Sequence, residues 1–193
     1  MLGKRLKCLQ KLEKLNIKIK KCRRCPLWKT AMNAVSGEGP INAKIMFVGE
    51  APGRQEDLTG RPFIGRAGEL LNRLLKIAQI KRENVFITSV IKHRPPKNRQ
   101  PKKPEIKACK IWWQKQIEIL KPKLIILLGR VASDTVLGKD FWKERERLYQ
   151  KEGGQYFITY HPAAGLRFPK IRACLQRDFV RLRQNLVFRS AQN

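Results

Sequence analysis

The sequence predicts an α/β protein: a three-layer α/β/α sandwich around a central, mostly parallel sheet of four strands. Short apolar runs alternate along the chain with longer segments of helical periodicity, which is typical of parallel strands joined by helices. Loops rich in glycine or proline follow two of these runs, where such sheets hold their ligand crevice. A single domain is expected over residues 1–193, because no shift in composition divides the chain.

Four segments are expected to form the strands. Two are short, continuous apolar runs, as in strands that are buried on both faces. One alternates and is rich in β-forming residues, and the last ends directly before a histidine. The four segments are residues 45–48, 84–91, 123–128 and 155–160.

Five segments are expected to form helices. Leucines recur at helical spacing in the first, and Pro104 suits the first turn of the third. The first helix leads into Cys22 and Cys25, so residues 1–30 are expected to pack on a metal site. The five helices are predicted at residues 4–20, 68–78, 104–120, 129–137 and 170–188.

The chain is strongly basic, with 43 lysines and arginines against 15 acidic residues and a formal net charge of +28. Such a charge opposes compaction unless the partner is a polyanion, so nucleic acid is the expected partner. The alternative is a lysine-rich, solvated surface. No apolar run approaches the roughly 20 residues of a membrane span, and the N-terminus does not resemble a secretory signal. We therefore expect a cytoplasmic or nucleoid-associated protein.

The segment 49–68, GEAPGRQEDLTGRPFIGRAG, is the clearest candidate for a ligand site. Its glycines allow tight turns and let backbone N–H groups approach a flat or anionic group. The segment also carries carboxylates and one aromatic residue, Phe63. Together these groups indicate a pocket for a planar ring that bears carbonyl groups.

Several motifs occur in order along nearly the whole chain. They are GEAPGRQED at 49–57, GRPFIGRAG at 60–68, RPPKNR at 94–99, Cys109, and HPAA at 161–164. In this combination the chain resembles the family 4 uracil-DNA glycosylases, which are iron–sulfur enzymes. The resemblance implies a monofunctional DNA repair enzyme that flips uracil out of DNA and hydrolyses its glycosidic bond, leaving an abasic site.

The resemblance implies two catalytic residues. Glu50 would assist the attacking water and the cationic sugar; its alternative is a surface or helix-capping carboxylate. His161 would donate a hydrogen bond to uracil O2 as a neutral imidazole, which a cationic neighbourhood favours. Its alternative is a structural histidine at the end of a strand.

The resemblance also implies a set of substrate-binding residues. Phe63 would stack on the flipped base, unless it is a core residue. Asp57, like Glu56, could instead orient the loop. Ser89 stands where the family usually has an amide side chain that reads the uracil edge, so specificity could extend to other deaminated bases. The full set is Gly49, Ala51, Pro52, Gly53, Asp57, Phe63 and Ser89.

A 4Fe–4S cluster is the cofactor that the resemblance implies. Cys22, Cys25 and Cys109 match three of its ligands, and His93 stands at the fourth position. Imidazole replaces thiolate in some clusters, and a Cys₃His set also suits zinc. The alternatives are a cluster that uses Cys8 or Cys174, a three-iron cluster, zinc, or no metal.

Basic residues flank the two expected catalytic loops and are predicted to contact phosphates. The predicted phosphate contacts are Arg94, Lys97, Arg99, Arg167 and Lys170. One residue of 166–168 is expected to fill the gap that the flipped base leaves. The protein is expected to act as a monomer, with a replication clamp as a possible further partner.

Two other functions compete with the glycosylase. A covalent uracil trap would carry a longer histidine-bearing loop, which residues 93–104 lack. A DNA-binding module could keep the pocket without turnover, a reading that the residues at 89 and 93 motivate. Alkali treatment of a uracil-containing oligonucleotide after incubation with the protein separates the three functions.

Overall fold

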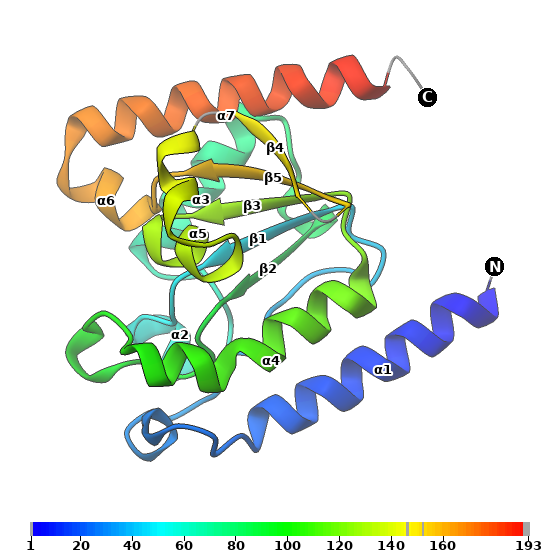
Figure 1. Ribbon diagram of the computed structural model, residues 1–193, viewed down its shortest axis with the longest axis vertical. Coiled ribbons are helices and arrows are strands. Elements are labelled where there is room, and N and C mark those ends of the chain that lie inside the picture. Colours follow the sequence, from blue (N-terminus) through cyan, green and yellow to red (C-terminus); the bar gives the residue numbers. More distant parts are fainter. Residues whose placement is uncertain (1, 146, 152, 191–193) are drawn as a thin grey trace.

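The computed structural model describes residues 2–145, 147–151 and 153–190. All its strands form one sheet in the order β2-β1-β3-β5-β4, of which four are parallel and β4 is antiparallel (Figure 1). The strands are β1 Ile45–Gly49, β2 Val85–Ser89, β3 Leu124–Leu128, β4 Leu148–Lys151 and β5 Gly154–Thr159. The predicted class of fold is confirmed.

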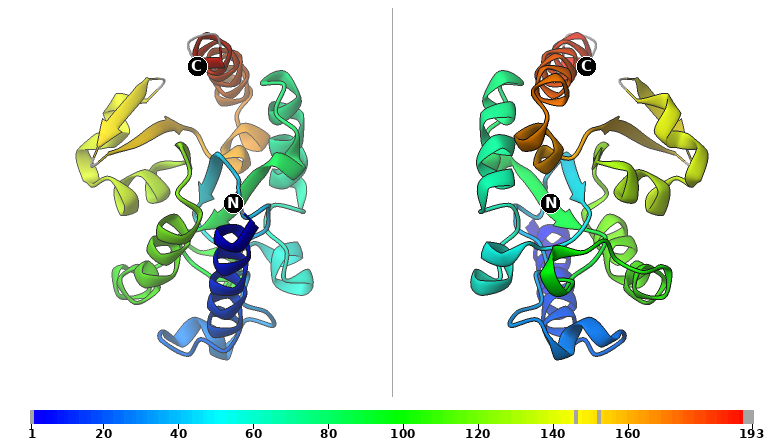
Figure 2. Two further views of the ribbon diagram at one scale, coloured as in Figure 1. Left: turned by 90° about the vertical axis from the view of Figure 1, so that its right-hand side faces the viewer. Right: turned by 90° about the vertical axis from the view of Figure 1, so that its left-hand side faces the viewer.

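Helices cover both faces of the sheet, as the two views of Figure 2 show. One face packs on α4 and α5, and α1 lies along the outer side of α4; the other face packs on α3, α6 and α7. The bounds are α1 Leu2–Lys20, α3 Arg66–Ile77, α4 Lys103–Leu120, α5 Arg130–Val136, α6 Pro162–Arg167 and α7 Pro169–Ser190.

The strand count of four was wrong, because the sheet has a fifth strand, β4. This edge strand is only four residues long, and its sequence LYQK has no continuous apolar run. It pairs antiparallel with β5, with Tyr149 opposite Tyr156. Edge strands are commonly short and charged, which hides them from apolar patterning.

One strand boundary and two short helices also differ from the prediction. The second strand ends at Ser89 rather than at residue 91. The glycine-rich segment contains a short helix, α2 Arg54–Thr59, and HPAA opens α6. Short 3₁₀ turns occupy Pro26–Lys29 (η1), Arg82–Asn84 (η2), Pro96–Asn98 (η3) and Lys139–Glu144 (η4). Residues 1 and 191–193 of the predicted domain lie outside the described residues.

The carboxyl ends of the parallel strands point toward the edge at which α2 and α6 lie, away from both chain termini (Figure 1). The loops after β1, β2 and β5 therefore meet there, as expected for a parallel sheet. Within the described residues, no helix is long and apolar enough to cross a bilayer.

Candidate active site

A cleft of about 490 Å³ opens at this edge of the sheet. Its wall contains Glu50 and His161, which follow β1 and β5, and Ser89, the last residue of β2. Phe63 comes from the glycine-rich segment. Among the other predicted site residues, Ala51, Pro52, Gly53, Arg99 and Arg167 also line the cleft. Side chains from segments far apart in the sequence therefore converge on one hollow.

Glu50 follows β1 directly, at a point where β1 and β2 stay paired beyond their last strand residues. Val90 N–H donates to the Gly49 carbonyl at 3.0 Å, and Ile91 N–H donates to the Glu50 carbonyl at 3.1 Å. The main chain of Glu50 is therefore fixed. Burial raises the pKa of its carboxyl above the usual value.

His161 precedes α6 and caps its first turn. Its Nδ1 accepts a hydrogen bond from Ala163 N–H at 3.1 Å, so in the neutral ring the proton sits on Nε2. Burial lowers the pKa of His161 to about 4, which keeps the imidazole neutral at ordinary pH. Gly129 packs against the Cβ of His161, and a Cβ added at Gly129 would lie 2.9 Å from that atom.

Phe63 is buried beside His161, with 5.6 Å between the ring centroids. Its φ of 51° lies in the left-handed region, which is unusual for a residue with a large side chain. Two glycines make room for it: a Cβ on Gly49 would lie 2.6 Å from the ring, and one on Gly68 would lie 1.9 Å from the Phe63 carbonyl oxygen. Gly49 therefore shapes the cleft from behind and does not line it.

Glu56 ties the two halves of the glycine-rich segment together. Its Oε2 accepts a hydrogen bond from Gly53 N–H, and its Oε1 accepts from the N–H groups of Ile64 and Gly65, all within 3.0 Å. A carboxylate at the start of α2 also suits the helix dipole. One side chain thus joins the loop before α2 to the turn that follows Phe63.

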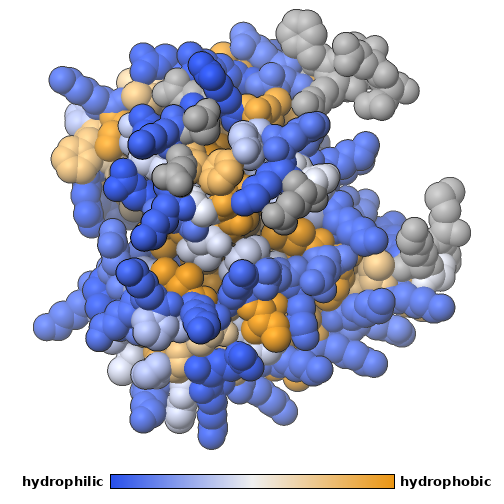
Figure 3. Space-filling view, viewed as in Figure 1, coloured by the Kyte–Doolittle hydropathy of each residue, from blue (hydrophilic) through white to orange (hydrophobic). Residues whose placement is uncertain are grey.

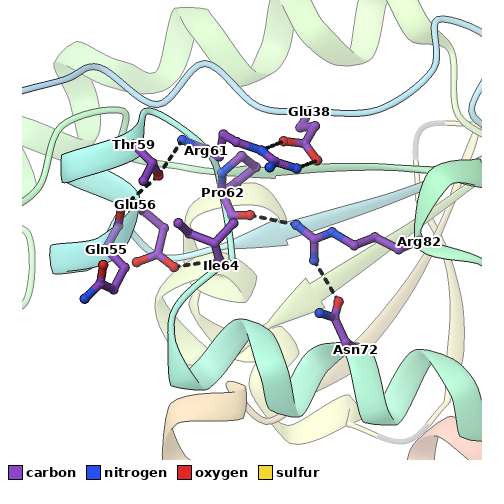
Figure 4. A network of polar contacts seen from close by, with 9 residues as sticks. All are labelled: Glu38, Gln55, Glu56, Thr59, Arg61, Pro62, Ile64, Asn72 and Arg82. Atoms are coloured by element: carbon purple, nitrogen blue, oxygen red, sulfur yellow. Dashed lines mark hydrogen bonds and ion pairs between the residues drawn. The ribbon is translucent and has the colours of Figure 1, made fainter.

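The residue before Phe63 is held from the opposite side (Figure 4). Arg82, from η2, donates to the Pro62 carbonyl at 2.8 Å and to Asn72 Oδ1 at 3.0 Å. Arg61 makes a two-point ion pair with Glu38 at 2.7 and 2.9 Å. The turn that presents Phe63 is therefore anchored at each neighbouring residue.

Asp57 does not line the cleft. Its buried Oδ1 accepts hydrogen bonds from the N–H groups of Met32 and Asn33, and Asn33 Nδ2 returns a bond to the Asp57 carbonyl. This carboxylate joins α2 to the segment that follows the CxxC. The geometry fits the loop-orienting role rather than contact with a substrate.

Ser89 lies at the floor of the cleft and is 5% exposed. Below it is a buried polar network that neither composition nor spacing indicated. Lys92 Nζ donates to the Ser89 carbonyl, to Thr88 Oγ1 and to Gln116 Oε1. Burial lowers the pKa of Lys92 to about 7.

Three of the four expected metal ligands are buried near one another: Cys109 lies on α4, and Cys22 and Cys25 follow α1. The thiols of Cys22, Cys25 and Cys109 interact electrostatically, Trp112 Nε1 donates to Cys22 Sγ at 3.2 Å, and burial raises the pKa of Cys109 to about 11. His93 is also buried, but the charged residue that affects its pKa is Asp57. Within the described part of the chain, no three His, Cys, Asp or Glu side chains form a group that could hold a metal ion.

The thiols suit iron–sulfur chemistry by type, and the main chain brings His93 close to them. Lys92 N–H donates a hydrogen bond to the Cys109 thiol, so the backbone of residue 93 runs beside that cysteine. The three thiols therefore fit an iron–sulfur cluster better than the His93 imidazole does. Cys8 and Cys174 are each partly exposed.

The predicted phosphate contacts differ in how free they are. The Arg99 guanidinium donates two hydrogen bonds, of 2.6 and 2.9 Å, to the Glu105 carboxylate in the first turn of α4, and forms an ion pair with it. Arg94 donates to Asn98 Oδ1 at 2.7 Å. Lys97 and Lys170 are exposed, and Arg167 reaches the mouth of the cleft. Hydrophilic side chains project over most of the face shown in Figure 3.

Sequence reasoning missed Arg82 and Lys92 as residues that support the site. Arg82 lies in a charged turn with no motif around it. One indication of Lys92 was present in the sequence. It directly follows the apolar residues Val90 and Ile91, where a lysine is unexpected unless it is paired.

The fold and the cleft define an α/β enzyme with a carboxylate, a neutral imidazole and an aromatic ring at the carboxyl edge of a parallel sheet. Residues 36–183 match the family model of the uracil DNA glycosylase superfamily, and the chain belongs to that superfamily. It is 42% identical over 192 residues to a type-4 uracil-DNA glycosylase of Sulfurisphaera tokodaii, covering 91% of this chain and 85% of the relative.

Two other type-4 uracil-DNA glycosylases are similarly close. The protein of Saccharolobus solfataricus is 43% identical over 92% of this chain and 88% of its own length. The protein of Thermotoga maritima is 46% identical over 81% of this chain and 83% of its own length. The family match at residues 36–183 spans all five strands and the loops that supply Glu50, Phe63 and His161.

Proposed function

We infer that this chain is a uracil-DNA glycosylase of DNA repair, a hydrolase that cleaves the bond between uracil and its deoxyribose. The convergence of Glu50, His161 and Phe63 on one cleft carries this conclusion. The type-4 relatives, which match over most of their length, support the same substrate.

We propose the following division of roles. The C1′–N1 bond breaks as the uracil leaves with the electron pair, and water forms the new bond to C1′. Ionised Glu50 stabilises the cationic sugar, orients that water and accepts the proton that the water loses, which then passes to solvent; the uracil anion takes up a proton from solvent after it leaves. His161 donates Nε2–H to uracil O2, where negative charge develops, and as a neutral donor it retains its proton.

Phe63 stacks on the flipped base, and the loop at 51–53 borders the opposite part of the cleft. A stacking contact contributes roughly 1–3 kcal/mol and accepts any base. Selectivity must therefore come from edge contacts, for which Ser89 supplies a hydroxyl that can donate or accept.

A uracil-containing oligonucleotide, incubated with the protein and then treated with alkali, tests the function. Strand scission with many turnovers supports the glycosylase. A band shift without scission supports a binding module, and an adduct that survives detergent supports a covalent trap. A duplex with cytosine in place of uracil is the control.

We propose further that the cysteine pocket holds a 4Fe–4S cluster with Cys22, Cys25, Cys109 and His93 as ligands. When bound, such a cluster supplies a structural tie between residues 1–30 and α4. The three neighbouring buried thiols support this proposal, as does the position of residue 93 beside Cys109.

Iron and sulfide analysis with an absorbance spectrum tests the ligand set. About four irons per chain with a broad band in the visible are expected, and His93→Cys should retain them. His93→Ala should lower the iron content. An unchanged iron content in His93→Ala would exclude the imidazole as a ligand, and zinc in place of iron would exclude the cluster.

The surface charge supports DNA contacts at the mouth of the cleft, and we propose Arg94, Lys97, Arg167 and Lys170 for them. Phe168, which is 56% exposed and lines the cleft, is our choice for the residue that fills the vacated base site. We also propose that the chain is a single domain that acts as a monomer, that it associates with the nucleoid and that a replication clamp is a further partner.

A further inference from the structure

Lys92, three residues after the end of β2 at Ser89, is completely buried, with an exposed fraction of 0%. Removing an ammonium group from water is costly unless hydrogen bonds replace the water. An apolar side chain would fill this space at a lower cost. A lysine here therefore needs a purpose other than packing.

Every N–H of the Lys92 ammonium has an acceptor. The distances are 2.6 Å to Thr88 Oγ1, 2.8 Å to the Ser89 carbonyl and 2.8 Å to Gln116 Oε1. The acceptors come from β2 and from α4, two elements that pack against each other. The ammonium therefore fixes the carboxyl end of β2 relative to the helix beneath it.

The main chain of residues 91 and 92 adds two more hydrogen bonds toward the cleft. Its carbonyl accepts a hydrogen bond from Val35 N–H at 2.7 Å, and Val35 lines the cleft. The preceding residue, Ile91, donates to the Glu50 carbonyl. One residue thus connects the cleft floor at Ser89 and the wall at Val35, while its neighbour holds Glu50.

We propose that Lys92 is a positioning residue for base recognition, which holds the Ser89 hydroxyl where the edge of the flipped base is read. The inference rests on the proposed function, since Ser89 reads a base only in a glycosylase or a base-binding pocket. Lys92 acts through Ser89 and touches no substrate.

Inhibition by free uracil measures the pocket alone, and binding of a duplex with a tetrahydrofuran abasic analogue measures the DNA surface. Lys92→Met keeps an unbranched side chain, one atom shorter than that of lysine, and removes all three donors. We expect it to raise the inhibition constant for uracil about tenfold, since the loss of one hydrogen bond to the base changes affinity by up to about that factor. Affinity for the abasic duplex should stay unchanged.

Leu182→Ala is the matched control for a general loss of stability. Leu182 is fully buried on α7, in the core on the other face of the sheet. It should lower the melting temperature and leave the uracil inhibition constant unchanged. If Leu182→Ala and Lys92→Met raise that constant equally, Lys92 is only a stabilising residue.

A double mutant separates positioning through Ser89 from other effects. Ser89→Ala alone should weaken uracil inhibition, and adding Lys92→Met should weaken it little further, because both changes remove the same contact. Fully additive effects would overturn the proposal. If Lys92→Met does not fold, Gln116→Leu, which removes one acceptor and touches no cleft residue, must itself raise the constant several-fold.

Failure of this proposal is distinguishable from failure of the proposed function. If the unmodified protein does not release uracil from DNA, the function is wrong. If it releases uracil and Lys92→Met is inhibited by uracil as strongly as the unmodified protein, only the role of Lys92 is wrong.

Discussion

In the proposed mechanism Glu50 must be ionised and His161 neutral, and burial shifts the pKa of each. Burial raises the pKa of Glu50, so this carboxyl loses its charge at a higher pH than a free glutamate. Burial lowers the pKa of His161 to about 4, so the ring stays neutral through the pH range in which a free histidine titrates. The acid limit of activity should therefore be set by Glu50.

The first prediction concerns the rate of uracil release under single-turnover conditions. The rate should be level through pH 6.5 and fall only as Glu50 protonates, above its usual value near 4.5. Glu50→Gln should lower the rate about 100-fold or more, as for loss of a positioned catalytic group. A step at pH 6.5 that persists in Glu50→Gln would assign the titration to His161 and contradict this prediction.

The second prediction concerns stability. Because the folded-state pKa of His161 lies below its unfolded value near 6.5, the unfolded chain binds more protons between about pH 4 and 6.5. The free energy of unfolding should therefore fall as the pH drops through that window. Thermal melts of His161→Asn, compared with the unmodified protein, should lack this part of the pH dependence.

At the scale of elements, the segment from β1 to α3 is shaped by contacts that glycine permits. The third prediction is that Gly68→Ala destabilises the protein by about 1–3 kcal/mol, because its Cβ would overlap the Phe63 carbonyl. Gly3→Ala on α1 is the matched control: nothing lies within 4 Å, and alanine favours a helix. Denaturant melts that show equal stability for both variants would contradict the tight contact.

The sequence allowed the elements with strong patterns to be predicted, and the reasons for the exceptions are physical. β1 and β3 are continuous apolar runs and β2 is rich in β-forming residues, so all three were recognisable without their neighbours. β4 depends on its hairpin partner, and α2 depends on the Glu56 carboxylate and on Gly60 with φ 72°. Both are set by contacts rather than by periodicity.

The same distinction holds within the site. Glu50, Phe63 and His161 lie in recognisable motifs, and the cleft brings them together. Arg82 and Lys92 support the site by hydrogen bonds to the main-chain carbonyls of Pro62 and Ser89, and the spacing of residues in the sequence does not reveal such bonds. Asp57 sits inside a motif and yet points to Met32 and Asn33, because a motif fixes the position of a residue but not the direction of its side chain.

At the scale of the molecule, the net charge of +28 should make DNA binding steeply dependent on salt. The fourth prediction is that log K falls linearly with log salt, with a slope of about −0.9 for each phosphate contacted. Arg167→Ala should reduce the slope by about one unit. Lys11→Ala, on the exposed side of α1 away from the cleft, is the control and should leave it unchanged.

The anchoring of Phe63 has a consequence for the thermodynamics of binding. Glu56, on the one side, and Arg82, on the other, already hold the turn around this residue in the absence of DNA. The conformational entropy of that turn is therefore lost during folding and not when the base arrives. Uracil enters a cavity that is already shaped, so the free energy of stacking can offset the cost of unpairing the base.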